Sequence, residues 1–288
     1  IRRIPEQVSH PLAAAVAKSI CLLQFVQSVH RTAENIAASL YPRLGAPSEL
    51  ENVKAALQVL EQANLVRKGD DGYRIPTPAE DDWDRVRNGT SPKPSDAKRL
   101  HREVMSGFWK PQPTYLLDGV KSFRAGLSID GHEEEKGDLM VHMVLADEGQ
   151  SFDDLKTELR TRSQQETDAI FWAVALSDAI DRDTVELFRS REMDARKSRD
   201  ARTPDQARLL SDEKNRARRH QAELQRLLRT ACLNGAAYFR GNDRSPSPAA
   251  GDVAKATTTI LNQILPDVFT RFGDGAAKPA DAKRGLDS

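Results

Sequence analysis

Residues 48–76 read SELENVKAALQVLEQANLVRKGDDGYRIP, and this stretch decides the fold of the N-terminal part of the chain. Ser48 and Glu51 have the spacing of a capping box, so a helix is predicted to begin here. Two short runs, 65–68 and 73–76, flank an Asp-Gly turn and predict a β-hairpin. The inner face of the predicted helix is apolar at helical spacing and contains Leu50, Val53, Leu57 and Leu60.

Two further helices are predicted before this stretch. The first covers 11–29, with Pro11 in its first turn, and the second covers 32–41. Three helices closed by a hairpin is the order of a winged helix-turn-helix, so we predict such a domain over 8–89. The positions that we expect to be buried are Leu12, Val16, Ile20, Leu23 and Val26 or Gln27 in the first helix, and Ile36, Ala37 and Leu40 in the second.

The remainder of the chain has the pattern of a small α/β module. Residues 90–113 predict a linker and a connecting helix, residues 114–272 predict strands alternating with helices, and residues 273–288 predict a disordered tail. The predicted fold class is therefore α+β and helix-rich. The predicted strands cover 120–129, 139–146 and 169–176, with a turn at 131–137 and helices at 96–109, 152–163 and 252–265.

A long helical hairpin is predicted within the second module, over about 178–233. Ser177 is expected to cap its first helix, and Thr203 with Pro204 to start its second helix. Basic residues outnumber acidic ones in this segment, which leads us to expect a basic interaction face. A solvated surface laced with i,i+4 ion pairs is the alternative interpretation. The expected seam is Leu210, Ala217, Leu224 and Leu228, and the expected basic face is Arg216, Arg219 and Arg226.

Composition limits the function classes. The 288 residues carry 43 Lys and Arg against 43 Asp and Glu, so any nucleic-acid contact is restricted to a local patch. No apolar run approaches the roughly 20 residues needed to cross a bilayer, and no membrane partner is expected. Cys21 and Cys232 lie far apart in a chain that we expect to be cytoplasmic. The chain begins at Ile1 rather than at methionine, and we interpret it as part of a longer protein.

No catalytic or metal-binding constellation is found in the sequence. Lys121-Ser122 lacks the glycines of a phosphate-binding Walker A loop, so no ATP site is predicted. His132, Glu133–Glu135 and His142 are interpreted as part of a solvated turn rather than as metal ligands. The two cysteines are interpreted as buried thiols. We therefore predict that this region is not an enzyme and holds no cofactor or metal.

The predicted hairpin carries the residues that we expect to contact DNA. Arg67, Lys68 and Arg74 would bind phosphates, and Lys54 on the third helix would add a further contact. Three glutamates on that same helix make its insertion into the major groove costly. Docking of a protein partner is an equal alternative use of such a domain.

Several stretches resemble one known family by their number and their order along the chain. They are Ala17–Val26 with Thr32–Ala38, Phe171-Trp172 with Ala175–Asp178, Leu187–Met193, Leu209-Leu210 with Glu213-Lys214, and Tyr238–Gly241. The family is the P-loop ATPase of bacteriophage exclusion (BREX) defence systems, called BrxC, or PglY in the phage-growth-limitation variant. The similarity covers about 8–272, a region downstream of the family's AAA+ ATPase domain.

The resemblance implies a role in a DNA-directed antiviral complex. It implies that the full-length protein uses ATP and Mg²⁺, and that other BREX components, a methyltransferase and an alkaline-phosphatase-like protein, are partners. It identifies no catalytic residue in this region. We therefore expect a non-catalytic DNA- and/or partner-binding region. The alternatives are a stand-alone winged-helix transcription regulator with a C-terminal sensing or dimerisation module, and a hidden hydrolase for which no constellation is found.

Overall fold

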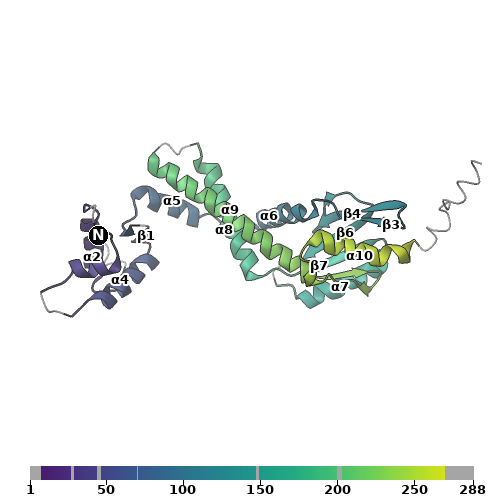
Figure 1. Ribbon diagram of the computed structural model, residues 1–288, viewed down its shortest axis with the longest axis horizontal. Helices are drawn as coiled ribbons and strands as arrows, with labels where there is room; N and C mark the ends of the chain where they lie inside the picture. The colour runs from purple at the N-terminus through teal and green to yellow at the C-terminus, as the bar shows by residue number, and fades with distance from the viewer. Residues whose placement is uncertain are drawn as a thin grey trace, which may run out of the picture. The chain divides into compact units, whose positions relative to one another are not determined.

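The structure, a computed structural model, describes residues 8–26, 29–43, 47–69, 71–146, 149–199 and 203–269. The chain divides into two units. The first unit comprises Ile1–Gly89 together with Arg202–Leu209, and the second comprises Thr90–Ala201 together with Leu210–Ser288. The fold is α+β, as predicted, with helices in both units and a mixed sheet in the second (Figure 1). The predicted tail, 273–288, lies outside the described residues.

The first unit contains three helices, a two-stranded hairpin and a fourth helix. In chain order these are α2 (Ala13–Leu23), α3 (Ala33–Ser39), α4 (Leu50–Gln62), β1 (Arg67–Gly69), β2 (Gly72–Arg74) and α5 (Pro78–Asn88). Two local predictions were wrong. Helix α2 ends at Leu23 rather than at residue 29, and the predicted capping box at Ser48 is absent because Glu49 occupies the N-cap without a side-chain bond. The hydroxyl of Ser48 instead accepts the N–H of Leu50 at 3.3 Å.

The core of the first unit forms from the inner faces of its first three helices. Val16 and Ile20 on α2, Ile36 on α3, and Leu57 on α4 are fully or almost fully buried in one cluster. Leu12, Leu23 and Leu40 are partly buried against the same cluster. The apolar spacing therefore predicted this core, except that Val26 is 43% exposed; its alternative, Gln27, lies outside the described residues.

The segment before α3 is tied to the hairpin. The N–H of Arg31 donates to Asp71 O at 2.9 Å, and the N–H of Tyr73 donates to Arg31 O at 2.8 Å. This places Gly72, at φ +95°, against the backbone of Arg31, where a Cβ would lie 2.3 Å from the carbonyl oxygen. Only glycine allows this close approach, so Gly72 fixes how the hairpin meets the helices.

Helix α5 was not predicted from the sequence, although its start carries a strong signal. The Thr77 hydroxyl accepts the N–H of Glu80, and the Glu80 carboxylate accepts the N–H of Thr77, which completes a capping box. Pro78 at the first position favours the helix further. Carboxylates of this helix reach the hairpin, as described below.

The second unit is built on a sheet with the strand order β3-β4-β6-β7-β8-β9, and β5 pairs with β4. Strands β4, β6 and β7 are parallel to one another, and β3, β5 and β8 pair antiparallel to their neighbours. The strands are β3 (Thr114–Leu117), β4 (Lys121–Ile129), β5 (His132–Glu135), β6 (Leu139–Leu145), β7 (Ala169–Val174), β8 (Ala236–Phe239) and β9 (Asn242–Asp243). The predicted turn at 131–137 was therefore wrong over β5, and β3 was missed.

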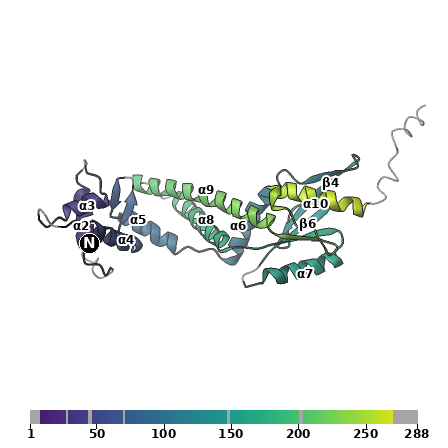
Figure 2. The same cartoon turned by 60° about the horizontal axis from the view of Figure 1, so that its bottom comes forward.

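Helices cover both faces of this sheet (Figure 2). Helix α7 (Phe152–Gln165) packs Leu155 and Leu159 on one face, against Phe171 of β7. Helix α10 (Val253–Val268) packs on the opposite face, where Trp172 of β7 is buried. Alternate residues of β7 thus serve two cores, which is why that strand is apolar throughout.

Residues 90–113, predicted as linker and connecting helix, belong to the core of the second unit. They contain α6 (Pro94–Ser106) and a 3₁₀ turn, Gly107–Trp109. The indole N–H of Trp109 donates to Ala125 O at 2.8 Å, and Met105 is buried in the main core. The segment thus packs as part of the sheet's helical cover.

Helices α8 (Asp178–Lys197) and α9 (Pro204–Leu233) lie side by side and antiparallel (Figures 1 and 2). Ser177 caps α8 by accepting the N–H of Ile180. Leu187 on α8 is buried in one cluster with Leu224 and Leu228 on α9. The tip of α9, up to Leu209, groups with the first unit. Within the described ranges, every helix is too short or too polar to span a bilayer.

Candidate functional site

The three cations of the hairpin have different surroundings. Arg67 forms an ion pair with Asp84 of α5. Arg74 donates two hydrogen bonds to Glu80, also on α5, from Nη1 to Oε2 at 2.6 Å and from Nη2 to Oε1 at 2.7 Å. Lys68 is exposed and makes no ion pair with any described residue. The structure therefore engages both arginines internally and leaves only the lysine facing solvent.

Glu80 lies at the centre of this arrangement. Its side chain is fully buried and also accepts a hydrogen bond from Arg208, near the tip of α9, at 2.7 Å. Burial raises the pKa of Glu80, but hydrogen bonds from Arg74, from the N–H of Thr77 and from Arg208 outweigh it and lower the pKa from 4.5 to about 2. The carboxylate is thus ionised at neutral pH and binds two arginines.

Helix α4 carries one cation, Lys54, and that cation is paired. Lys54 is paired with Glu51 at 2.9 Å, one turn away on the same helix. Lys54 and Lys68 border a hollow that Glu34 and Asp71 also line, so its wall carries both signs of charge. The predicted DNA-contacting lysines are thus brought together, but beside two carboxylates. Such a hollow is a poor match for a phosphate group alone.

An apolar patch lies at the end of α2. Phe25 is 86% exposed and Leu22 is 69% exposed, and Val26 follows them. Three large apolar side chains within five residues are unusual on a solvated surface, and such exposure is typical of contact surfaces. This patch was not predicted from the sequence, because Val26 or Gln27 was assigned to the buried stripe and neither Leu22 nor Phe25 was singled out. The signal was present, since Leu22 lies outside the helical spacing of the buried residues.

The predicted basic face of α9 is largely paired. Arg216 contacts the buried Glu213 at 3.0 Å, and Arg226 donates two hydrogen bonds to Glu223, at 2.9 and 2.6 Å. Arg219 forms no ion pair in the part of the chain that the structure describes. The three arginines thus fall into two classes, because only Arg219 keeps an uncompensated charge.

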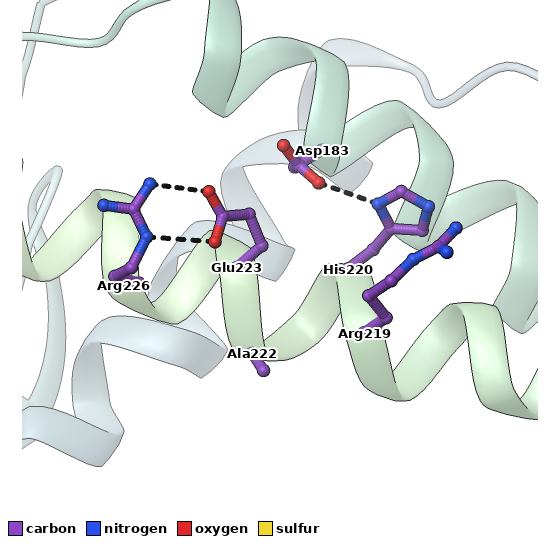
Figure 3. A pocket seen from close by; sticks show the side chains of 6 residues that line it. All are labelled: Asp183, Arg219, His220, Ala222, Glu223 and Arg226. Atoms are coloured by element: carbon purple, nitrogen blue, oxygen red, sulfur yellow. Dashed lines mark hydrogen bonds and ion pairs between the residues drawn. The ribbon is translucent and has the colours of Figure 1, made fainter.

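Arg219 and Arg226 border a hollow on α9 (Figure 3). Nδ1 of His220 lies 2.7 Å from Oδ1 of Asp183, which links α9 to α8 beside this hollow. The exposed Ala222 lies between the longer side chains. Two internal pairs therefore hold the walls of the hollow, and Arg219 stands at its edge.

The histidines and cysteines noted in the sequence do not cluster in the structure. His132 lies on β5 and His142 on β6, on opposite sides of β4, and no group of metal-ligating side chains occurs within the described ranges. Cys232 is buried, which raises the pKa of its thiol to about 12, whereas Cys21 is only half-buried rather than buried as predicted. A buried thiol with a raised pKa, as at Cys232, is a poor nucleophile at neutral pH.

Comparisons with models of protein families, with curated proteins and with solved structures found no significant match.

Proposed function

We propose that this chain is a non-catalytic, protein-binding region of a BREX defence ATPase, with a winged helix-turn-helix over residues 8–89. The order of α2, α3, α4 and the hairpin supports the winged helix. The backbone hydrogen bonds between Arg31 and the hairpin add to that support, because they join the hairpin to the segment that precedes α3. The ATPase relationship rests on the resemblance described above.

The observation that carries the proposal is the exposure of Phe25, at 86%, beside Leu22, at 69%. Burying such side chains fully against a partner contributes about 1.5–3 kcal/mol each. A large aromatic residue flanked by aliphatic ones is the composition of an interface core. A protein partner with an apolar surface is therefore the occupant that this patch favours.

DNA is the second candidate, and Lys68 is the observation that favours it. An exposed lysine on a hairpin is well placed for a phosphate contact. The carboxylates of α4 and α5 oppose a larger contact, because they pair Lys54, Arg67 and Arg74 within the chain. We therefore place DNA contact, through Lys68, second to protein docking.

Direct binding measurements test this proposal. The purified chain is immobilised and titrated with the methyltransferase and with the alkaline-phosphatase-like protein of the BREX system from the same genome. Saturable binding of one of them is expected, together with no ATP turnover by the chain alone, since it carries no Walker A loop. Absence of binding to both proteins, or ATP turnover by the isolated chain, contradicts the proposal.

A further inference from the structure

The outward face of α2 carries an apolar row that contains one charge. Ala15, Lys18, Leu22 and Phe25, the outer row, follow one another in steps of three, four and three residues. The N–H of Phe25 donates to Leu22 O at 3.2 Å, which continues the turn of the chain beyond the end of α2 at Leu23. Residues at these steps lie on one side of a helix. Lys18, Leu22 and Phe25 are exposed, and Ala15 is partly exposed.

The composition of α2 is that of a helix covered on both sides. Its inner face packs Val16 and Ile20 into the core of the first unit. Lys18 is the only charged residue among the 11 residues of the helix. A helix that is apolar on all sides is typically buried within protein. The outer row of α2 therefore has the character of a surface that a further element covers.

Lys18 decides which occupant the outer row favours. It makes no ion pair with any described residue, and residues 8–33 contain no Asp or Glu. An occupant with a carboxylate opposite Lys18 compensates this charge, whereas a second copy of α2 brings another lysine and no carboxylate. Burying the two lysines of such a symmetric pair without a partner is costly. Charge complementarity thus favours a different helix over a second copy of this one.

We propose that the outer row docks an amphipathic helix of a protein partner, with apolar side chains on Leu22 and Phe25 and a carboxylate beside Lys18. Steps of three and four residues are the spacing of a seam between two packed helices, and one polar residue within such a seam fixes the register of the pair. The inference rests on the proposed function, because it gives the partner's chemistry at the apolar patch of the same helix.

Fluorescence anisotropy with three labelled helical peptides tests the inference. Each peptide is Ala-rich and about 18 residues long, so that it is helical on its own. The Glu probe carries leucines at steps of three and four residues with one glutamate in the middle of that face. The Lys probe has lysine in place of the glutamate, and the Ser probe has serines in place of the leucines. We expect the Glu probe to bind the chain with a Kd below about 1 mM. The Lys and Ser probes should bind at least about fivefold more weakly.

Two variants and one control locate the site. Lys18→Glu is expected to exchange the preference, so that the Lys probe binds more tightly than the Glu probe, because like charges now face each other in the second complex. Leu22→Ser should weaken binding of the Glu probe at least about fivefold. Lys255→Glu changes the net charge equally at an exposed position on α10, and it should alter affinity less than about twofold.

Four outcomes overturn the inference. The first is no binding of the Glu probe up to about 1 mM. The second is a preference for the Glu probe that persists in Lys18→Glu. The third is a wild-type dimer in sedimentation that Leu22→Ser dissociates, which makes a second copy the occupant. The fourth is binding to anionic phospholipid vesicles in place of the peptide, lost in Leu22→Ser, which makes a lipid surface the occupant.

The inference and the proposed function fail separately, because the probes are synthetic. If the BREX proteins bind the chain through Phe25 but the Glu probe does not bind, only the inference is wrong. If the Glu probe binds in a Lys18-dependent manner but the BREX proteins do not bind, only the proposed function is wrong.

Discussion

Arg67 and Arg74 stand directly opposite each other in the β1–β2 hairpin, and each binds a carboxylate on α5. Like charges opposite each other in an antiparallel pair repel and destabilise it. Asp84 and Glu80 lie four residues apart, one turn of α5, so both carboxylates face the hairpin. The two arginines are therefore structural residues that hold α5 against the hairpin.

Replacing Glu80 by Gln should destabilise the first unit by about 3 kcal/mol at pH 7, since a folded pKa of about 2 lies well below the ordinary 4.5. A lowered pKa gives stability that is present above pH 4.5 and lost as pH falls through about 2. The gap between variant and wild type should therefore close by pH 2. Hydrogen exchange of the segment around α5 measures it, and the exposed Glu51→Gln is the control. An equal gap at pH 2 and pH 7 would show that the ionised carboxylate is unimportant.

His101 should make the second unit sensitive to mild acid. Its Nε2 lies 2.9 Å from Oγ1 of Thr184, while its Nδ1 is buried without a partner in the described structure. Burial lowers the pKa of His101 from 6.5 to about 4. The unfolded chain then binds a proton that the folded chain does not, so stability falls as pH drops from 6.5 to 4, by about 3 kcal/mol.

The variant His101→Gln tests this assignment, because glutamine can still donate to Thr184 but does not titrate. Urea titrations at pH 7 and pH 4.5 should show a smaller pH effect for the variant than for the wild type. A pH effect of the same size in both proteins assigns the acid sensitivity to another group.

Leu224→Asp should disrupt the packing of α8 against α9. Leu224 is fully buried, so the change removes an apolar contact and buries an unpaired carboxylate. A melting temperature lower by roughly 10 °C is expected for the second unit. Gln225→Asp introduces the same side chain at the next, exposed position, and calorimetry should find it nearly unchanged. If both substitutions lower the melting temperature equally, the burial of Leu224 between α8 and α9 is contradicted.

Any DNA contact by the hairpin should depend on Lys68 alone. Only this hairpin cation lacks an ion pair among the described residues. Lys68→Ala should reduce the slope of log affinity against log salt by about 0.9, the value for one phosphate. Arg67→Ala and Arg74→Ala should lower stability and leave the slope unchanged. If the salt slope falls equally in all three variants, the two arginines also contact DNA, which contradicts this prediction.

The sequence predicted the elements whose signals are local. The apolar spacing of α2 and α4 identified Ile20 and Leu57 as core residues, and the Asp-Gly turn located the hairpin. The uniformly apolar run of β7 predicted a strand buried on both faces. In each case one short pattern is sufficient, because burial or turn chemistry at those positions does not depend on a distant partner.

The roles of the candidate site residues depend on side chains and strands far away in the sequence. Predictions from local patterns were therefore wrong for these residues. The positive charge of Arg74 predicted a DNA contact. In the structure Arg74 instead binds Glu80, six residues further along the chain, and Arg208 binds the same carboxylate. The charged residues of β5 have the composition of a solvated turn. They form a strand because they pair with the neighbouring β4. The exposure of Phe25 could not be derived from hydrophobicity, which favours burial of every phenylalanine.

The affinity of the chain for the BREX methyltransferase and the alkaline-phosphatase-like protein, measured for wild type, Phe25→Ser and Gln24→Ser, tests the central claim most directly. Gln24 is an exposed neighbour of Phe25, so its substitution controls for effects on the end of α2. The protein-docking account predicts that Phe25→Ser weakens binding at least tenfold while Gln24→Ser changes it less than twofold. Binding to neither protein, or binding that Phe25→Ser leaves unchanged, would contradict the account.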